Sequence, residues 1–193
     1  MRVIAGSARR LLLKAPQGLE TRPTADKYKE TLFNVLAPYL YADTEFLDLF
    51  AGSGAIGIEA LSRGVKHAVF VERSKKAAEC IEENLKNTHL RDQAQVMTED
   101  VFSALSRLSG KHVFGIVFLD PPFGQELEKS VLERLSGSDL IDDDSLVVME
   151  VRNDTDLSYL NDPGSFFKII KQKTYKSNSH VFLEIAHKKG DLS

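Results

Sequence analysis

The middle of the chain alternates short apolar segments with longer stretches of helical period, and this alternation constrains the fold more than any other feature. The apolar segments cover residues 45–50, 67–71, 95–97, 113–119 and 145–151. Strands that are apolar on both faces are typical of parallel sheets with helices on either side. Parallel neighbours also require a long crossover connection, and the intervening stretches have the length of helices. The pattern therefore predicts an α/β fold built from βαβ units.

Helical spacing of apolar residues places helices at 54–63, 74–87 and 125–135. The C-terminal part has a different pattern. Residues 166–173 and 180–186 are rich in β-forming side chains and are joined by a short polar turn. We therefore expect an antiparallel pair that closes one edge of the sheet.

The N-terminal part forms an extension to this domain. Residues 2–5 and 10–14 predict a small hairpin, and a helix is expected over residues 24–36. We divide the chain into this hairpin-and-helix extension, residues 1–40, and a main domain, residues 41–193.

A glycine-rich loop joins the first apolar strand to the helix that follows it. Its pattern is Gly52-x-Gly54-x-x-Gly57. Glycines allow a ligand to approach the backbone closely, and the start of a helix offers free N–H groups. The pattern also fits the fingerprint of dinucleotide sites, and its position between a strand and a helix strengthens that match. We therefore expect the loop to bind a ligand that contains adenosine.

Three carboxylates stand where successive strands end. Asp48 lies just before the glycine loop, where it would repel a pyrophosphate but could bind the ammonium of a methionine moiety. Glu72 ends the next strand, and a carboxylate there can accept hydrogen bonds from ribose hydroxyls. Asp100 follows the third strand and could accept from an adenine amino group or, alternatively, cap a helix before Val101. Asp48 thus favours S-adenosylmethionine over NAD, whereas Glu72 suits both.

The tetrapeptide Asp120-Pro121-Pro122-Phe123 follows the fourth strand, whose end faces the ligand crevice in a parallel sheet. The prolines fix the backbone and remove two donors, which leaves the Asp120 carboxylate and the Pro121 carbonyl as acceptors. Acceptors on both N–H bonds of a base amino group favour its pyramidal, more nucleophilic form, and Phe123 can stack on the base. The motif predicts methyl transfer to a flipped-out base, with catalysis dominated by positioning.

The net charge of −3 hides a segregation of charge along the chain. Residues 1–30 hold seven Lys and Arg against three Asp and Glu, and residues 165–193 hold six against two. Residues 31–164 hold twelve against twenty-three. The basic ends indicate a polyanion such as nucleic acid, although solvated surface charge explains them equally well. The acidic middle contains the expected cofactor and catalytic residues.

Other chemistries find little support in the sequence. Five histidines show no metal-ligand spacing, so we expect no metal site. They are His67, His89, His112, His180 and His187. The single cysteine, Cys80, cannot form an internal disulfide, which fits a reducing cytoplasm. No apolar run reaches the roughly 20 residues of a membrane-spanning helix, so we expect no membrane partner.

Three stretches together resemble one known family. They are Arg22-Pro23-Thr24 with residues 30–34, the segment 47–64, and Asp120-Pro121-Pro122-Phe123. They are similar to the RsmD family of bacterial methyltransferases, which act on the N2 atom of a guanine in 16S ribosomal RNA. The resemblance extends from Ile4 to the C-terminal strands. The first stretch is the family-specific part, because the other two are shared by many amino methyltransferases.

The resemblance implies a class I S-adenosylmethionine-dependent methyltransferase fold, which is Rossmann-like, with a mostly parallel seven-stranded sheet and helices on both faces. It implies N2 methylation of a specific guanine by a cytoplasmic enzyme, on ribosomal RNA either free or within a small-subunit assembly particle. We expect a monomer, although the sequence leaves the oligomeric state open. The expected cofactor-binding residues are Asp48, Phe50, Ala51, Gly52, Ser53, Gly54, Gly57, Glu72, Arg73, Asp100 and Val101. The expected catalytic residues are Asp120, Pro121, Pro122 and Phe123. The expected RNA-binding residues are Arg9, Arg10, Arg22, Thr24, Tyr175 and Lys176.

The chain departs from the family pattern where RNA contacts are expected. Residues 8–11 lack a glycine that the family usually carries, and Ala25, Lys27 and Lys176 also differ from the usual residues. These departures leave the RNA contacts open but not the chemistry. Three alternatives remain: an adenine-N6 DNA or other amino methyltransferase, an NAD(P)-dependent oxidoreductase, and a non-catalytic RNA-binding assembly factor. The oxidoreductase leaves Asp48 and the Asp120 motif unexplained, and 193 residues leave little room for a DNA target-recognition domain.

Overall fold

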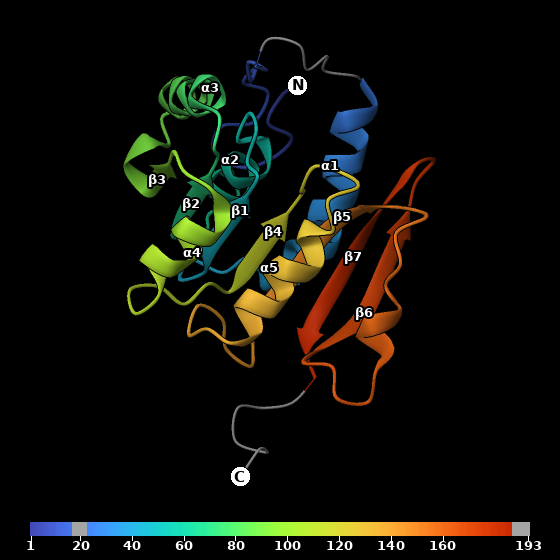
Figure 1. The fold of residues 1–193 in the computed structure, drawn as a ribbon. Helices are drawn as coiled ribbons and strands as arrows, with labels where there is room; N and C mark the ends of the chain where they lie inside the picture. The colour runs from blue at the N-terminus through green and yellow to red at the C-terminus, as the bar shows by residue number, and fades with distance from the viewer. Residues whose placement is uncertain (17–22, 187–193) are drawn as a thin grey trace.

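A seven-stranded sheet forms the centre of the molecule in a computed structural model, which describes residues 1–16 and 23–186 (Figure 1). The strand order is β3-β2-β1-β4-β5-β7-β6. The strands are β1 (Glu45–Leu49), β2 (His67–Val71), β3 (Ala94–Met97), β4 (Ile116–Leu119), β5 (Leu146–Arg152), β6 (Phe167–Thr174) and β7 (Asn178–Ile185). Strands β1 to β5 pair in parallel, whereas β7 runs antiparallel to both β5 and β6. The mostly parallel seven-stranded sheet and its antiparallel edge are as predicted.

Helices cover both faces of this sheet. They are α1 (Pro23–Leu36), α2 (Ala55–Ser62), α3 (Lys75–Asn87), α4 (Val101–Leu108) and α5 (Leu127–Ser136), with short 3-10 turns η1 (Ala37–Tyr39), η2 (Arg91–Gln93) and η3 (Ser158–Asn161). Helices α4 and α5 share one hydrophobic core with the sheet, and α1, α2 and α3 share another on the opposite face. The sequence predicted this arrangement from strands that are apolar on both faces.

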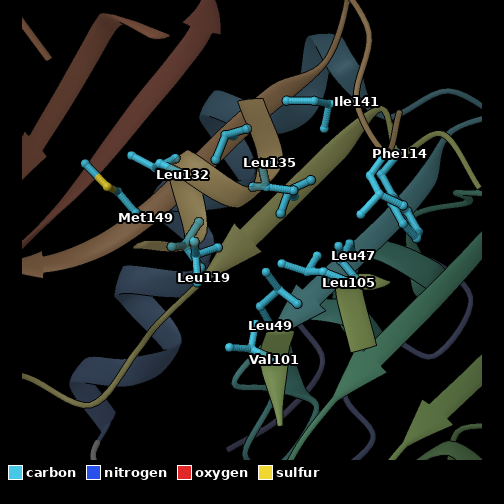
Figure 2. Close-up of a cluster of buried hydrophobic side chains, with 14 of the residues drawn as sticks. Leu47, Leu49, Val101, Leu105, Phe114, Leu119, Leu132, Leu135, Ile141 and Met149 are labelled. Atoms are coloured by element: carbon cyan, nitrogen blue, oxygen red, sulfur yellow. The ribbon is translucent and has the colours of Figure 1, made fainter. Parts of the chain in front are cut away.

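The strand pleat sends alternate side chains into the two cores. In β1, Leu47 and Leu49 belong to the core under α4 and α5, whereas Phe46 belongs to the other. Figure 2 shows Leu47 and Leu49 beside Leu105 of α4, and Leu119 beside the side chains of α5. Asp48 therefore faces the same side as Phe46, toward α2. Buried apolar side chains on both faces fix the register of the sheet and so the positions of its strand ends.

Two strands begin two or more residues away from the predicted start, while the other strand boundaries differ by at most one residue. The segment 113–119 becomes a strand only at Ile116, because the Phe114 N–H donates to the Leu140 carbonyl (2.8 Å) and Val113 is 51% exposed in the approach loop. Strand β7 begins at Asn178 rather than at residue 180, which shortens the turn that joins it to β6. The antiparallel pairing of β6 and β7 therefore extends closer to the turn than the apolar residues of β7 indicate.

The N-terminal segment packs into the same core as the sheet. A single antiparallel bridge joins Arg2 and Leu12, so the predicted hairpin is short. Val3 and the α1 residue Phe33 lie in the core with Phe46 of the sheet. Helix α1 begins at Pro23, one residue before the predicted start. Among the residues that the structure describes, no helix is both long and apolar enough to cross a membrane.

A buried carboxylate ties the N-terminal segment to α1 and α2. Glu59 of α2 has no exposed surface, and its oxygens accept the N–H groups of Ile4 (2.8 Å) and Ala5 (3.0 Å). It also forms ion pairs with Lys29 of α1 (3.1 Å) and with Arg63 (2.8 Å). Burial lowers the pKa of Lys29, and the Glu59 carboxylate opposes that effect. A buried carboxylate with this many partners fixes the position of α1 at the edge of the crevice described next.

Candidate active site

The glycine loop and the Asp120 loop lie side by side because β1 and β4 are neighbours in the sheet. The chain leaves β1 toward β2 but leaves β4 toward β5, so the two connections diverge at the carboxyl ends of these strands. Such a switch point opens a crevice for a ligand. The Asp120 N–H donates to the Leu49 carbonyl (3.5 Å), which joins the two loops directly.

Two cavities open at this switch point. The larger one, about 520 Å³, is lined by Glu72, Asp100 and the Asp120–Phe123 loop, among others. The smaller one, about 290 Å³, is lined by Gly52 and Ser53 of the glycine loop and by residues of α1, β5 and β7. Phe50 and Asp120 line both cavities. The two cavities therefore form the two halves of one crevice, with Asp120 where they meet.

The glycine loop has a backbone that side chains would disturb. Gly52 and Gly54 have φ angles of 57° and 75°, in the left-handed region that favours glycine. At Gly57, a Cβ atom would lie 2.4 Å from the Phe70 ring, so the start of α2 approaches the sheet as closely as glycine allows. The loop thereby brings its backbone, rather than side chains, to the crevice.

Asp48 lies under the loop rather than in either cavity. It is 2% exposed, lines neither half of the crevice, and its Oδ2 atom accepts the Gly57 N–H (2.9 Å). Burial raises the pKa of Asp48 to about 8, and the Gly57 hydrogen bond opposes that rise only in part. In this geometry Asp48 braces the start of α2, so a direct contact with a methionine ammonium stays a prediction.

Glu72 and Asp100 line the larger cavity from the ends of β2 and β3. The Glu72 oxygens accept the N–H groups of Gly52 (2.9 Å) and Ser74 (2.7 Å) and retain lone pairs for further donors. Asp100 caps α4, because its Oδ1 atom accepts the N–H groups of Phe102 (3.1 Å) and Ser103 (3.0 Å). Hydrogen bonds from Ser103 and Phe102 hold the pKa of Asp100 below its usual range.

Other predicted residues complete the lining. Arg73 and Val101 lie in the larger cavity with Pro121, Pro122 and Phe123, and the Phe123 ring is 52% exposed. Ala51 and Ser53 lie in the smaller cavity. The structure thus collects most of the predicted cofactor and catalytic residues at one crevice.

Asp120 sits in an electrostatically unfavourable position for a carboxylate. Its residue is exposed toward the crevice, where it lines both cavities, while protein atoms crowd the remaining sides of the carboxylate. Burial raises the pKa of Asp120 well above its usual range, and the charge of Glu150 raises it further. Within the described part of the chain, no donor hydrogen-bonds to the Asp120 carboxylate. A ligand that brings N–H donors would relieve this desolvation.

A hydrogen-bonded chain of side chains lines the smaller cavity opposite the glycine loop. His180 Nε2 lies 3.1 Å from Glu150 Oε2, and His180 Nδ1 lies 3.1 Å from the Tyr175 hydroxyl. A neutral His180 with its proton on Nε2 satisfies both bonds, donating to Glu150 and accepting from Tyr175. The Tyr175 ring packs against the Tyr28 ring of α1, with centroids 4.3 Å apart. The chain thus connects β5, β7 and α1.

Sequence reasoning missed most of this chain. Tyr175 is among the residues expected to contact RNA, but no site role is predicted for Tyr28, Glu150 or the buried His180, which is 3% exposed. One signal was available, because Glu150 is an acidic residue inside the otherwise apolar strand β5. Sheet order brings His180 to the crevice, and the packing of α1 against the sheet brings Tyr28 there.

The expected RNA-binding residues are spread over the N-terminal segment and the β6–β7 turn. Arg9, Arg10 and Lys176 are exposed. Arg22 lies outside the described residues, and Thr24 lies in α1 with a side chain that the structure does not describe. Their contacts with RNA remain predictions.

The fold, the switch-point crevice and its two loops define a class I S-adenosylmethionine-dependent methyltransferase. Within that class, the chain belongs to the RsmD family: a family model described as "Conserved hypothetical protein 95" matches residues 1–184. Ribosomal RNA small subunit methyltransferase D of Haemophilus influenzae is 38% identical over 160 residues, which cover 81% of each chain. YlbH of Bacillus subtilis is 42% identical over 158 residues, or 81% of this chain and 85% of YlbH. The solved structure of yhhF from Escherichia coli has a TM-score of 0.81 at 30% identity, covering 96% of this chain and 97% of that one.

Proposed function

We propose that this protein transfers the methyl group of S-adenosylmethionine to the N2 amino group of a guanine in small-subunit ribosomal RNA. The observation that carries the proposal is the position of Asp120, an acceptor without a donor among the described residues, where the two cavities meet. Relatives that are 37–38% identical bear the name ribosomal RNA small subunit methyltransferase D. This name is the basis for proposing small-subunit ribosomal RNA as the substrate.

The larger half of the crevice fits the adenosine of the methyl donor. Glu72 has lone pairs for the ribose hydroxyls, and Val101 and Phe102 offer an apolar wall for the adenine ring. The Gly52–Ser53 backbone in the smaller half fits the methionine end, with Asp48 beneath it. When bound there, S-adenosylmethionine supplies a sulfonium methyl group, which is electrophilic.

The smaller half favours guanine over adenine as the target base. Guanine presents its N2 amino group next to an N1–H, which is a row of donors, whereas adenine places the N1 acceptor next to its amino group. Asp120 and Glu150 both line this half and both are acceptors. A guanine edge would satisfy Asp120 and add a donor to Glu150, whose oxygens already pair with Asn178 and His180. An adenine edge would turn a lone pair toward one of the two carboxylates.

The residues of this chain then act chiefly by positioning. Asp120 and the Pro121 carbonyl accept the two N–H bonds of the amino group, which aims the nitrogen lone pair at the methyl carbon. The nitrogen–carbon bond forms as the sulfur–carbon bond breaks, and the sulfur keeps the electron pair. The Asp120 carboxylate then takes the proton that the methylated nitrogen loses. Its raised pKa suits this acceptance.

The N-terminal extension and the β6–β7 turn are the proposed RNA surface. Met1, Tyr28 and Lys29 border the smaller cavity, so the extension meets whatever enters it. Strand β6 runs in the direction of β5, so its final residue, Thr174, lies at the same end of the sheet as Asp120. The exposed Arg9, Arg10 and Lys176 belong to these two segments.

A methyl-transfer assay with three substrates tests the proposal. Labelled S-adenosylmethionine is incubated with undermethylated small-subunit particles, naked small-subunit rRNA or DNA, and the modified nucleoside is mapped. We expect N2-methylguanine in RNA, and more of it in the particle, because the modest basic charge of the ends favours recognition through shape. Methyladenine in DNA, or no transfer to any substrate, would contradict the proposal.

A further inference from the structure

We propose that the amino-terminal end of the sheet carries a site for a divalent transition metal of the zinc type, formed by Glu45, His67 and His112. One ligand atom from each side chain lies within 4.8 Å of the other two. Two imidazoles and a carboxylate are an established ligand set for Zn²⁺, with water in the fourth tetrahedral position. The site lies at the opposite end of the strands from Asp120.

The fold brings these three residues together from distant parts of the chain. Glu45 and His67 are the first residues of β1 and β2 and are direct partners in the parallel register. His112 lies in the loop that leads to β4, where its ring stacks on the buried Phe114 ring with centroids 5.4 Å apart. The histidine spacing in the sequence gave no sign of the cluster, because sheet order rather than a local motif creates it.

Contacts within the cluster leave its ligand atoms suitably placed. Lys66 holds Oε1 of Glu45 (3.2 Å), while Oε2 faces Nδ1 of His112 (2.8 Å). A metal would take the place of the proton between Oε2 and Nδ1, so Glu45 would bind through one oxygen and keep its Lys66 contact. Tetrahedral ligands at about 2.0–2.1 Å from Zn²⁺ lie about 3.3 Å apart, so rotations of these half-buried side chains can close the site.

His67 is ready to act as a ligand. Its ring has no hydrogen-bond partner within the part of the chain that the structure describes. The neighbouring cavity, about 580 Å³, is lined by Glu45 with Asp43, Asp142 and Asp144. This acidic surrounding favours a cation over an anion.

Such a metal would act on stability rather than on methyl transfer. Strand β1 separates Glu45 from the glycine loop by about 13 Å, at roughly 3.3 Å per residue. Binding would join the starts of β1 and β2 to the loop before β4, and any ligand that prefers the folded state stabilises it. The inference does not rest on the proposed guanine chemistry, and either can fail alone.

Zinc titration of the untagged protein against a chromophoric chelator tests the site. We expect one equivalent of Zn²⁺ to bind, and the double variant His67→Ala/His112→Ala to weaken that binding at least about a hundredfold, since even outer-sphere changes cost about 10–100-fold. His89→Asn is the matched control, because His89 is exposed and Asn tolerates its positive φ of 59°. This control should bind like the wild type.

Thermal unfolding and cofactor binding complete the test. Zn²⁺ should raise the melting temperature of the wild type and of His89→Asn but not of the double variant, while S-adenosylmethionine binding stays unchanged in all three. If the double variant fails to bind S-adenosylmethionine, Glu45→Gln provides the same zinc test with a smaller change in shape. Zinc binding that is absent in the wild type, or equal in the wild type and a folded variant, overturns the proposal.

Discussion

The two halves of the crevice are built in different ways. The half that fits adenosine is lined mainly by residues close to the ends of parallel strands. Phe50 and Glu72 directly follow β1 and β2, and Asp100 is the third residue after β3. The half that fits the methionine end and the target base also depends on α1, β5 and β7, through Tyr28, Glu150 and His180. A strand end places the residue after it, whereas the second half exists only once the whole sheet has formed.

The two halves also differ in how their carboxylates are satisfied. Both Glu72 oxygens already accept backbone N–H groups. Asp120 has no such donor within the described residues and faces the charge of Glu150 across the cavity. The larger half, which fits adenosine, therefore has its carboxylate hydrogen-bonded before a ligand binds. Asp120 in the smaller half gains stability from a ligand rich in N–H donors. Variants of the two halves should accordingly fail in different kinetic parameters.

Asp120→Ala should have the largest effect. We expect single-turnover methyl transfer to fall by about 10²–10³-fold, since the variant removes an acceptor on the reacting amino group. The dissociation constant of S-adenosylmethionine should change little. The measurement combines rapid-quench transfer rates with calorimetric binding of the cofactor.

The reciprocal variant, Glu72→Gln, serves as the control for this prediction. It should weaken cofactor binding about tenfold, the loss expected for one charge-assisted hydrogen bond, and recover its transfer rate at saturating cofactor. Equal losses of binding and rate in both variants would show that the two halves do not act separately.

Glu150→Gln should have a smaller effect of a distinct kind. We expect about a tenfold loss of transfer rate, because one acceptor for the guanine edge becomes a mixed donor and acceptor. Asp120 must be ionised to accept the proton of the methylated nitrogen, so the transfer rate should rise with pH through the raised pKa of Asp120. Burial is the main cause of that rise in pKa, and the Glu150 charge is the second. The variant should therefore move the acidic limb of the pH–rate profile to lower pH.

A cofactor titration of Glu150→Gln decides which half this residue serves. Unchanged binding of S-adenosylmethionine would support a role for Glu150 in binding the target base. Weakened binding, with an unshifted pH profile, would instead place Glu150 at the methionine ammonium.

The same difference explains how much of the molecule the sequence could reveal. The glycine loop and the Asp120 motif were identifiable because each follows an apolar strand directly, and parallel pairing then brings the strand ends together. The role of Asp100 was ambiguous, because a carboxylate at this position can cap a helix and can also bind a ligand. Glu150, His180 and the His67–His112 cluster could not be found by spacing, because residues on different strands meet only through sheet order.

Charge reversal in the N-terminal segment should affect RNA binding alone. Arg9→Glu with Arg10→Glu should weaken RNA binding and flatten its dependence on log salt by about 0.7–0.9 for each phosphate that the segment no longer neutralises. Lys75→Glu with Lys76→Glu, on exposed positions of α3, changes the net charge equally and is the control. Salt slopes measured by fluorescence anisotropy should fall for the first pair only. An unchanged slope would exclude this segment from the RNA surface.

Asp48→Asn should have the smallest effect on methyl transfer, because the change concerns stability. Folded Asp48 keeps its proton to about pH 8, whereas the unfolded chain loses it near the ordinary value of 3.8. Between these values folding takes up a proton, so the free energy of unfolding falls as pH rises. Asn takes up no proton and can still accept the Gly57 N–H, so the variant should lose this fall.

Urea unfolding between about pH 5 and 8 measures the difference, with the exposed Asp92→Asn as control. The stability curves of wild type and Asp48→Asn should diverge as pH rises, with the variant more stable at the upper end, while Asp92→Asn follows the wild type. Parallel curves for all three proteins would mean that Asp48 is already ionised in the folded state. Asp48 would then be a charged group available to the methionine ammonium. Like Asp120, it would depend on its ligand to offset the cost of burying the charge.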